Sequence, residues 1–300
     1  MTRFLIFFFC IILQSAICQE DYTLYYKRLY YADKLLAKKQ WDKAIIIYDS
    51  LIKNYKYSKE ASSCAGTLSF KKGNFSKASI YFLKLASLGV EYDDLGYSSF
   101  DCDLCFTNKN LYLLEDKVPT FRRSYIVILG KLVSGYNREF DESLKSMLIT
   151  DQAYRADFNI SESDPNYKQH KKIINQKRDE VDSLNLIELK RLIKKYGCLP
   201  IFPMVSQKSL LAFTLILTHN STVPWCSKYC DTLLKQVRVR FKNGNCIPPL
   251  VFANIIDRKF HHIYNQNYYC QFYDKELSIF EPESLNARRA EIFLQPIEQK

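Results

Sequence analysis

A segment near the N-terminus of this chain matches itself at an offset of 34 residues. The paired positions are Leu36/Phe70, Lys38/Lys72, Trp41/Phe75, Lys43/Lys77, Ala44/Ala78, Tyr48/Phe82 and Leu51/Leu85. A period of this length marks one supersecondary unit, which cannot bury its hydrophobic face alone and must stack on a neighbour. The match therefore predicts stacked pairs of helices near the N-terminus.

The residue types at these positions resemble those of the tetratricopeptide repeat. In that repeat a small residue, here Ala44 and Ala78, lets two helices approach closely, and Ala32 and Gly66 supply the small residue of the first helix. The aromatic residues that would fill the space beside the small residue are Trp41, Tyr48, Phe75 and Phe82. The early Trp and the closing Pro of the repeat are missing, and Lys56 stands at the position of the Pro. The resemblance implies a concave face that binds a protein or peptide partner; amphipathic helices that match by chance are the alternative.

The N-terminus has the pattern of a signal peptide. Arg3 precedes an apolar run from Phe4 to Leu13, and Ala16-Ile17-Cys18 places small residues at the positions that a signal peptidase reads. We expect cleavage after Cys18 and a periplasmic or secreted chain. A lipid anchor on Cys18 is disfavoured by the bulky Ile17, and an uncleaved anchor would need about 20 apolar residues. The later run from Leu210 to Leu217 is also too short, so the mature chain is expected to have no transmembrane segment.

Length and charge indicate how the mature chain is organised. Its 300 residues, 47% of them apolar, predict about two domains. We expect a signal peptide at 1–18, helical repeats at 19–120 with a third helix pair starting near Tyr92, and a second helical domain at 121–300. Arg3 is the one charged side chain among residues 1–18. Cleavage therefore leaves 42 basic and 32 acidic side chains, a net charge of +10. The basic residues form scattered pairs without a block of five, which favours a solvated surface and argues against nucleic acid as a partner.

Eight of the ten cysteines remain after the expected cleavage, and export would permit disulfides. Cys102 and Cys105 have the spacing of a redox or zinc motif, but the nearest comparable pair, Cys226 and Cys230, lies more than a hundred residues away. The adjacent His261-His262 pair faces two directions on a helix and makes a poor metal site. We therefore expect buried thiols with one or two disulfides, and neither a metal ion nor a cofactor.

From about residue 121 the repeat ends and a different helical pattern begins. Leu144, Leu148, Asp151 and Arg155 follow one another at four, three and four residues, which places them on one stripe of a helix. Asp151 and Arg155 lie one turn apart, so this spacing predicts a partly buried ion pair.

The remaining helix boundaries follow from capping residues and helix breakers. Asn185 is expected to cap a helix that Gly197 ends, and an apolar helix is expected from Gln207 to His219. Asp231 is expected to cap the next helix, which Gly244 ends, and Pro248-Pro249 to open another. No alternating strand pattern with hairpin turns is present, so the sequence predicts an all-α chain.

A second resemblance covers about residues 140–273. The motifs that carry it are Asp151-Gln152-Ala153-Tyr154-Arg155, Gly197-Cys198-Leu199-Pro200, Thr218-His219, Asp257-Arg258 and Gln266-Asn267-Tyr268-Tyr269-Cys270-Gln271. This part of the chain is similar to an uncharacterised family, a domain of unknown function, of exported and cytoplasmic bacterial proteins. The chain departs from that family at Thr218, where the family has Gln, and at Tyr269-Cys270, where it has Gly-Thr. The resemblance implies a polar cluster but no reaction.

The polar residues of these motifs allow two interpretations. A carboxylate beside His219 would orient the imidazole as a general base, which makes His219, Asp151 and Asp257 the catalytic candidates. No nucleophile elbow, phosphate loop or His-Glu-x-x-His motif is present, so no nucleophile is identified. In the other interpretation the charges are buried salt bridges, Asp151 with Arg155 and Asp257 with Arg258 or His219.

Two classes of function remain open at this point. The first is a binding or assembly protein of the bacterial envelope, which holds a protein partner through its helical repeats. The second is an exported hydrolase centred on His219. Convergence of His219, Asp151, Asp257 and Gln271 on an open pocket would favour the enzyme, and pairing under a closed surface would favour the binding protein.

Overall fold

The structure is a computed structural model that describes residues 22–97, 106–131, 136–156, 166–222, 224–270, 278–294 and 296–297. The expected signal peptide, Cys102, Cys105 and Gln271 lie outside the described residues. Within the described ranges the chain forms twelve α-helices, and the only strands are two residues each, Gln266–Asn267 (β1) and Ser278–Ile279 (β2), paired in parallel. The expectation of an all-α chain is therefore confirmed.

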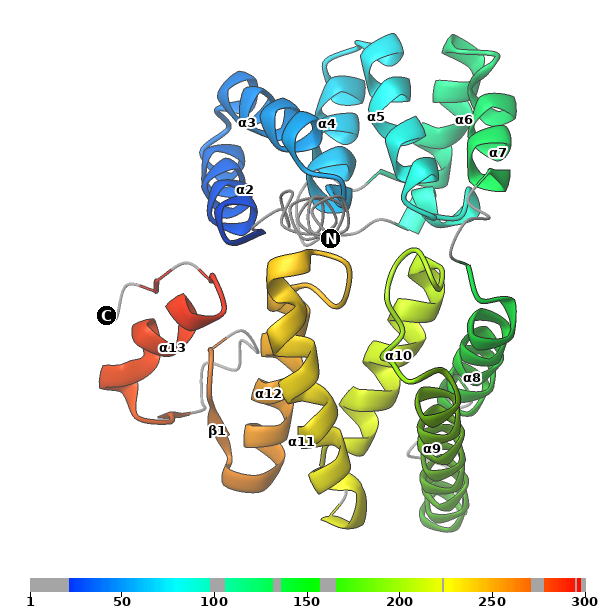
Figure 1. The fold of residues 1–300 in the computed structure, drawn as a ribbon, viewed down its shortest axis with the longest axis vertical. Coiled ribbons are helices and arrows are strands. Elements are labelled where there is room, and N and C mark those ends of the chain that lie inside the picture. The colour runs from blue at the N-terminus through cyan, green and yellow to red at the C-terminus, as the bar shows by residue number, and fades with distance from the viewer. Residues whose placement is uncertain are drawn as a thin grey trace, which may run out of the picture.

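The N-terminal helices form three consecutive helix pairs that lie side by side across one half of the molecule (Figure 1). Their bounds are α2 Tyr22–Ala37, α3 Trp41–Asn54, α4 Lys59–Lys71, α5 Phe75–Ser87, α6 Asn108–Lys117 and α7 Phe121–Gly130, with a 3-10 turn, η1, at Asp93–Tyr97. Trp41 and Phe75, which match at the 34-residue offset, each begin the second helix of a pair. The third pair begins at Asn108, beyond the expected position near Tyr92.

The apolar residues of the match pack in the hydrophobic cores of the N-terminal helices. Ala44, Ala78, Tyr48 and Phe82 are fully buried, whereas Trp41 and Phe75 are half-buried at the helix starts. A Cβ atom on Gly66 would lie 2.8 Å from the Phe82 ring, a distance that real Cβ contacts do not reach. The close contact of α4 with α5 therefore requires a residue without a side chain at position 66.

The helices of the second half of the chain lie below the N-terminal helices in this view (Figure 1). Their bounds are α8 Arg138–Ala156, α9 Tyr167–Tyr196, α10 Gln207–Asn220, α11 Pro224–Val239, α12 Pro249–Tyr264 and α13 Leu285–Glu291, with 3-10 turns η2 at Arg240–Asn243 and η3 at Pro282–Ser284. α10 begins where the Ser206 hydroxyl accepts a hydrogen bond from the Ser209 N–H at 3.3 Å, and α9 ends at Gly197 in the left-handed conformation. The expected end of α9 at Gly197 and the expected start of α12 at Pro249 are confirmed.

Two expected helix starts are wrong. Asn185 does not cap a helix, because α9 begins at Tyr167 and Asn185 lies buried inside it, with its amide 3.5 Å from the Met147 carbonyl oxygen. Asp231 likewise lies inside α11, which starts at Pro224. Asn and Asp favour N-caps, but their side chains are tolerated inside a helix when a neighbouring element supplies a hydrogen bond or a counter-charge. Asp231 has such a partner in Lys259, at 2.5 Å.

The hydrophobic core changes between α7 and α8. Phe121 and Tyr125 of α7 pack with Phe82 and Leu114 in the core of the N-terminal helices, whereas Phe140 and Leu144 of α8 pack in the core of the second half. Packing therefore assigns α7 to the N-terminal array, so this array extends past residue 120.

Aromatic contacts join the two halves. Tyr57 packs edge-on against Phe202 with ring centroids 5.6 Å apart, and Tyr26 stacks on Phe293 at 6.1 Å. Gly244, at φ +63°, lies so close to Tyr22 that a Cβ there would be 2.3 Å from the ring. Each of these contacts pairs a residue before 60 with one after 200, so the halves share a packed junction.

Two further expectations concern cysteines and membranes. Cys198, Cys246 and Cys270 are free thiols, and burial raises the pKa of the Cys246 thiol to about 11. No disulfide joins two cysteines within the described ranges, so the expected bridges are not found there.

None of the described helices is both long and apolar enough to cross a membrane.

Candidate functional site

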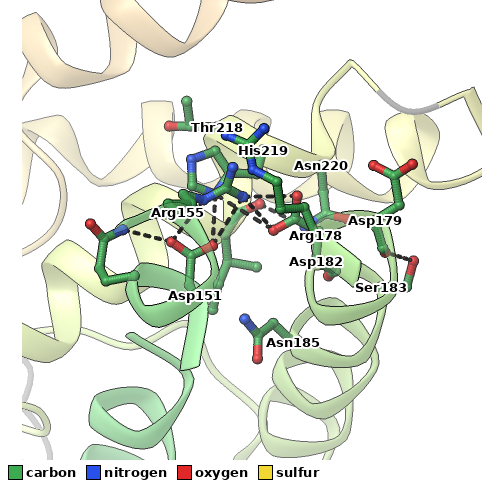
Figure 2. Close-up of polar contacts among 12 residues, drawn as sticks. Asp151, Arg155, Arg178, Asp179, Asp182, Ser183, Asn185, Thr218, His219 and Asn220 are labelled. Carbon is green, nitrogen blue, oxygen red and sulfur yellow. Dashed lines mark hydrogen bonds and ion pairs between the residues drawn. The ribbon is translucent and has the colours of Figure 1, made fainter. Parts of the chain in front are cut away.

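Among the described residues, a buried polar cluster lies where α8, α9 and α10 meet (Figure 2). Asp151 and Arg155 come from α8, Asp182 from α9, and His219 from the last turn of α10. We call these four residues the three-helix cluster. Their side chains are only 3%, 19%, 13% and 7% exposed, in the same order, so the cluster is largely closed to solvent.

The local sequence explains why charges are buried here. On α8, Leu144, Met147 and Leu148 face the core, and the next position on this stripe is Asp151. On α9, Asp182 follows the buried Val181 and lies one turn before Leu186. Each carboxylate therefore continues an apolar stripe, and it needs a partner to remain ionised there.

Arg155 joins the two carboxylates. Its Nε donates to Asp151 Oδ2 and its NH2 group to Asp151 Oδ1, both at 3.1 Å. The same NH2 group donates to both oxygens of Asp182, at 2.6 and 2.9 Å. The expected Asp151 to Arg155 pair is confirmed, and one guanidinium connects α8 to α9 through charge-assisted hydrogen bonds.

His219 completes the cluster from α10. Its Nδ1 lies 2.9 Å from Asp151 Oδ1 and 3.7 Å from Asp182 Oδ1. An ionised carboxylate can only accept, so Nδ1 carries the hydrogen, and a neutral ring then has its lone pair on Nε2. Within the described part of the chain no group bonds to Nε2. Asp151 therefore orients His219 as the carboxylate of an Asp-His pair would.

The electrostatic environment shifts the pKa values of the two carboxylates in opposite directions. Burial alone would raise the pKa of Asp151, but hydrogen bonds from His219 and Arg155 outweigh it and hold the pKa well below its usual range. Burial raises the pKa of Asp182, although the bond from Arg155 opposes this shift. Burial would lower the pKa of Arg155, and its bonds to both carboxylates raise it instead. Asp151 is thus the carboxylate that most strongly favours its ionised form.

The cluster also has a set of atoms that a metal ion could use. Asp151, Asp182 and His219 each offer one ligand atom, and these atoms lie within 4.8 Å of one another. Two carboxylates and an imidazole are a common ligand set for divalent metals. Arg155, however, already bonds to both carboxylates, so an ion would have to displace its guanidinium. The residues present fit an ion-pair network better than a metal centre.

The other residues expected at the site lie elsewhere, with one exception. Gln152 is exposed, and its amide donates to Asp151 at 2.7 Å. Asp257 is fully buried in the middle of α12, where its Oδ1 accepts the backbone N–H groups of Tyr268, at 2.7 Å, and of Tyr269. Gln266 is partly exposed in β1.

The expected pairing of Asp257 with Arg258 or His219 is wrong. Arg258 is exposed, since consecutive residues of a helix do not face one another, and His219 bonds to Asp151 instead. Asp257 holds the backbone after α12 in place. The Tyr268 ring lies beneath the Arg288 guanidinium, 4.5 Å from its centroid. This second group of polar residues therefore fixes the C-terminal segment and does not join the three-helix cluster.

Sequence reasoning missed Asp182. A signal was present, because Asp182, Leu186 and Leu189 share one stripe of α9, as Leu144, Leu148 and Asp151 do on α8. The helix was expected to start at Asn185, so this position fell outside it.

Comparisons with known proteins do not assign this site. No protein-family model matches the chain, and neither a curated protein nor a solved structure matches it at a significant level.

Proposed function

We propose that this protein is an exported binding or assembly module, in which helices α2 to α7 hold a protein or peptide partner. The observation that carries the proposal is the pair Ile46 and Ile80. These residues match at the 34-residue offset, on α3 and α5, and their side chains are 67% and 64% exposed. Large apolar side chains exposed at equivalent positions of consecutive helix pairs suit a surface that a partner covers.

Further exposed apolar residues and the local charge support the same proposal. Six more large apolar residues on α2, α6 and α7 are exposed: Leu24, Tyr31, Tyr112, Leu113, Ile126 and Val127. Residues 22–131 contain 18 Lys and Arg against 11 Asp and Glu, a net charge of +7. Complementary charge speeds encounter and selects partners, so the partner is expected to combine acidic with apolar residues.

An exported hydrolase centred on His219 is the second candidate. The orientation of His219 by Asp151, with Nε2 left without a partner in the described ranges, is the observation that favours it. Against it, the imidazole is only 7% exposed, Arg155 occupies the carboxylates, and Asp257 does not converge on the histidine.

The test is copurification with matched double variants. Ile46→Glu with Ile80→Glu places charges on the proposed surface, whereas Leu184→Glu with Ile187→Glu changes two residues of α9 that are 58% and 59% exposed. We expect one partner to be recovered from envelope extract with the wild type and the α9 variant and to be lost with the α3/α5 variant. Recovery of no specific partner, or equal recovery with both variants, would contradict the proposal.

A further inference from the structure

A cavity of about 270 Å³ lies at the junction between the two halves of the chain. It is bounded by α2 and the start of α4 on one side and by α10 and the loop before α12 on the other. Junctions between packed units are common places for small-ligand sites. The volume lies just under the lower end of the usual range of about 300 to 1,000 Å³, so an occupant would be small.

The walls of the cavity are mainly apolar. Leu88, Phe202, Leu210 and Ile247 line it and are each at most 6% exposed. Val251 of α12 adds a half-buried wall. Side chains of this kind favour an apolar ligand body through the area they remove from water.

Lys59 supplies a positive charge among these walls. Its side chain is partly buried, and among the described residues it donates one hydrogen bond, from Nζ to Gln207 Oε1 at a long 3.4 Å. Within the described ranges no carboxylate oxygen lies within 4.0 Å of this ammonium group. Burial lowers the pKa of Lys59, while Glu60 and Asp94 oppose this shift from a greater distance. Partial burial of an ammonium group without a close carboxylate is unfavourable, and an anion in the cavity would relieve this.

We propose that this cavity binds a small organic monocarboxylate with an apolar body, held by an ion pair with Lys59. A single ammonium group matches a single negative charge. Glu60 also lines the cavity and Asp94 lies near Lys59, so a dianion such as phosphate would be repelled more strongly than a monoanion. This site does not depend on the partner surface of α2 to α7, and it can be tested without a partner.

Octanoate, octylamine and 1-octanol are suitable probes, because they share one chain and differ in the headgroup. We expect octanoate, below its aggregation concentration, to bind saturably in calorimetry and to raise the melting temperature, with the other two binding at least tenfold more weakly. Lys59→Met should weaken octanoate binding at least tenfold. Lys53→Met, a change of an exposed lysine on α3, should leave it unchanged.

A second variant guards against misfolding of Lys59→Met. Leu211 lines the cavity but is 51% exposed, so Leu211→Trp can obstruct the cavity from its rim with little effect on the core. This variant should also lose octanoate binding. The proposal is overturned if octanoate does not bind saturably, if octylamine or octanol binds equally well, or if both variants bind octanoate as the wild type does.

Discussion

Replacement of Arg155 by Ala tests whether the three-helix cluster holds α8, α9 and α10 together. The substitution removes the guanidinium that bonds to both Asp151 and Asp182, and it leaves two carboxylates that are 3% and 13% exposed. His219 and Gln152 remain as partners of Asp151, whereas Asp182 loses both hydrogen bonds from Arg155 and keeps His219, at 3.7 Å.

The expected loss of unfolding free energy follows from the partners that the two carboxylates keep. Removing one member of a buried ion pair costs about 3 to 5 kcal/mol, since the remaining charge is left without its partner. Asp151 keeps two hydrogen-bond partners, so we expect the lower end, about 3 kcal/mol of unfolding free energy. In a domain of about 150 to 250 residues each kcal/mol lowers the melting temperature by about 2 to 4 °C, which gives a shift of about 6 to 12 °C.

The measurement is urea unfolding followed by circular dichroism, with Arg191→Ala as the matched control. Arg191 forms two hydrogen bonds of 2.7 Å with Glu188 on the same helix, but its side chain is 50% exposed. Exposed pairs contribute less than about 1 kcal/mol, so the control should lose little stability. If Arg155→Ala also lost less than about 1 kcal/mol, the cluster would not be a buried support of the fold, and the reasoning would be refuted.

Three other substitutions test separate parts of the fold, each by melting temperature or urea midpoint. Gly244→Ala should destabilise the chain by more than Gly73→Ala, because both have positive φ but only Gly244 would place its Cβ against the Tyr22 ring; equal losses would mean that this junction is loose. Ala78→Trp should cost about 1 to 3 kcal/mol by overpacking a fully buried position, and an unchanged melting temperature would mean that the 34-residue register is accidental. Burial raises the pKa of Asp33 to about 6, against a bond from Tyr48 that lowers it, so this residue favours folding below pH 4 and that contribution, about 3 kcal/mol, is lost as the pH rises through 6. Asp33→Asn should therefore reduce the fall in stability between pH 4 and 7, and an unchanged pH profile would contradict the assignment.

Much of the helical architecture could be predicted because its signals are local. The 34-residue offset placed Trp41 and Phe75 at equivalent helix starts, and Gly197 and Pro249 mark a helix end and start through backbone conformation alone. The helix starts predicted at Asn185 and Asp231 are wrong because the capping preference of Asn and Asp is weak. It is overridden when a neighbouring helix supplies a polar partner for the side chain. The start of α9 carries five Lys and Arg within 168–178 and few apolar residues, so periodicity gave no sign of its first turns.

The candidate site could be predicted only in part, for a related reason. Spacing of four residues determines that Asp151 and Arg155 meet, because both lie on one helix. The contact of Asp182 with Arg155 spans 27 residues, and that of His219 with Asp151 spans 68, so both depend on how three helices pack. Asp257 shows the limit of such reasoning: its inward position was predicted correctly, but it accepts hydrogen bonds from two backbone N–H groups, which no sequence pattern identifies.

The ranking of substitutions within the cluster separates a structural role from a catalytic one. If the cluster is structural, Arg155→Ala removes four hydrogen bonds that reach two carboxylates, whereas His219→Ala removes one bond of 2.9 Å and leaves Asp151 bonded to Arg155 and Gln152. The loss of stability should then be largest for Arg155→Ala, smaller for His219→Ala and smallest for Arg191→Ala. This order does not depend on the absolute energies. A catalytic histidine predicts a different order, with His219→Ala as stable as the wild type or more stable, because active-site residues are often not optimised for stability. Urea midpoints of the three variants under one buffer condition therefore distinguish the two roles before any substrate is known.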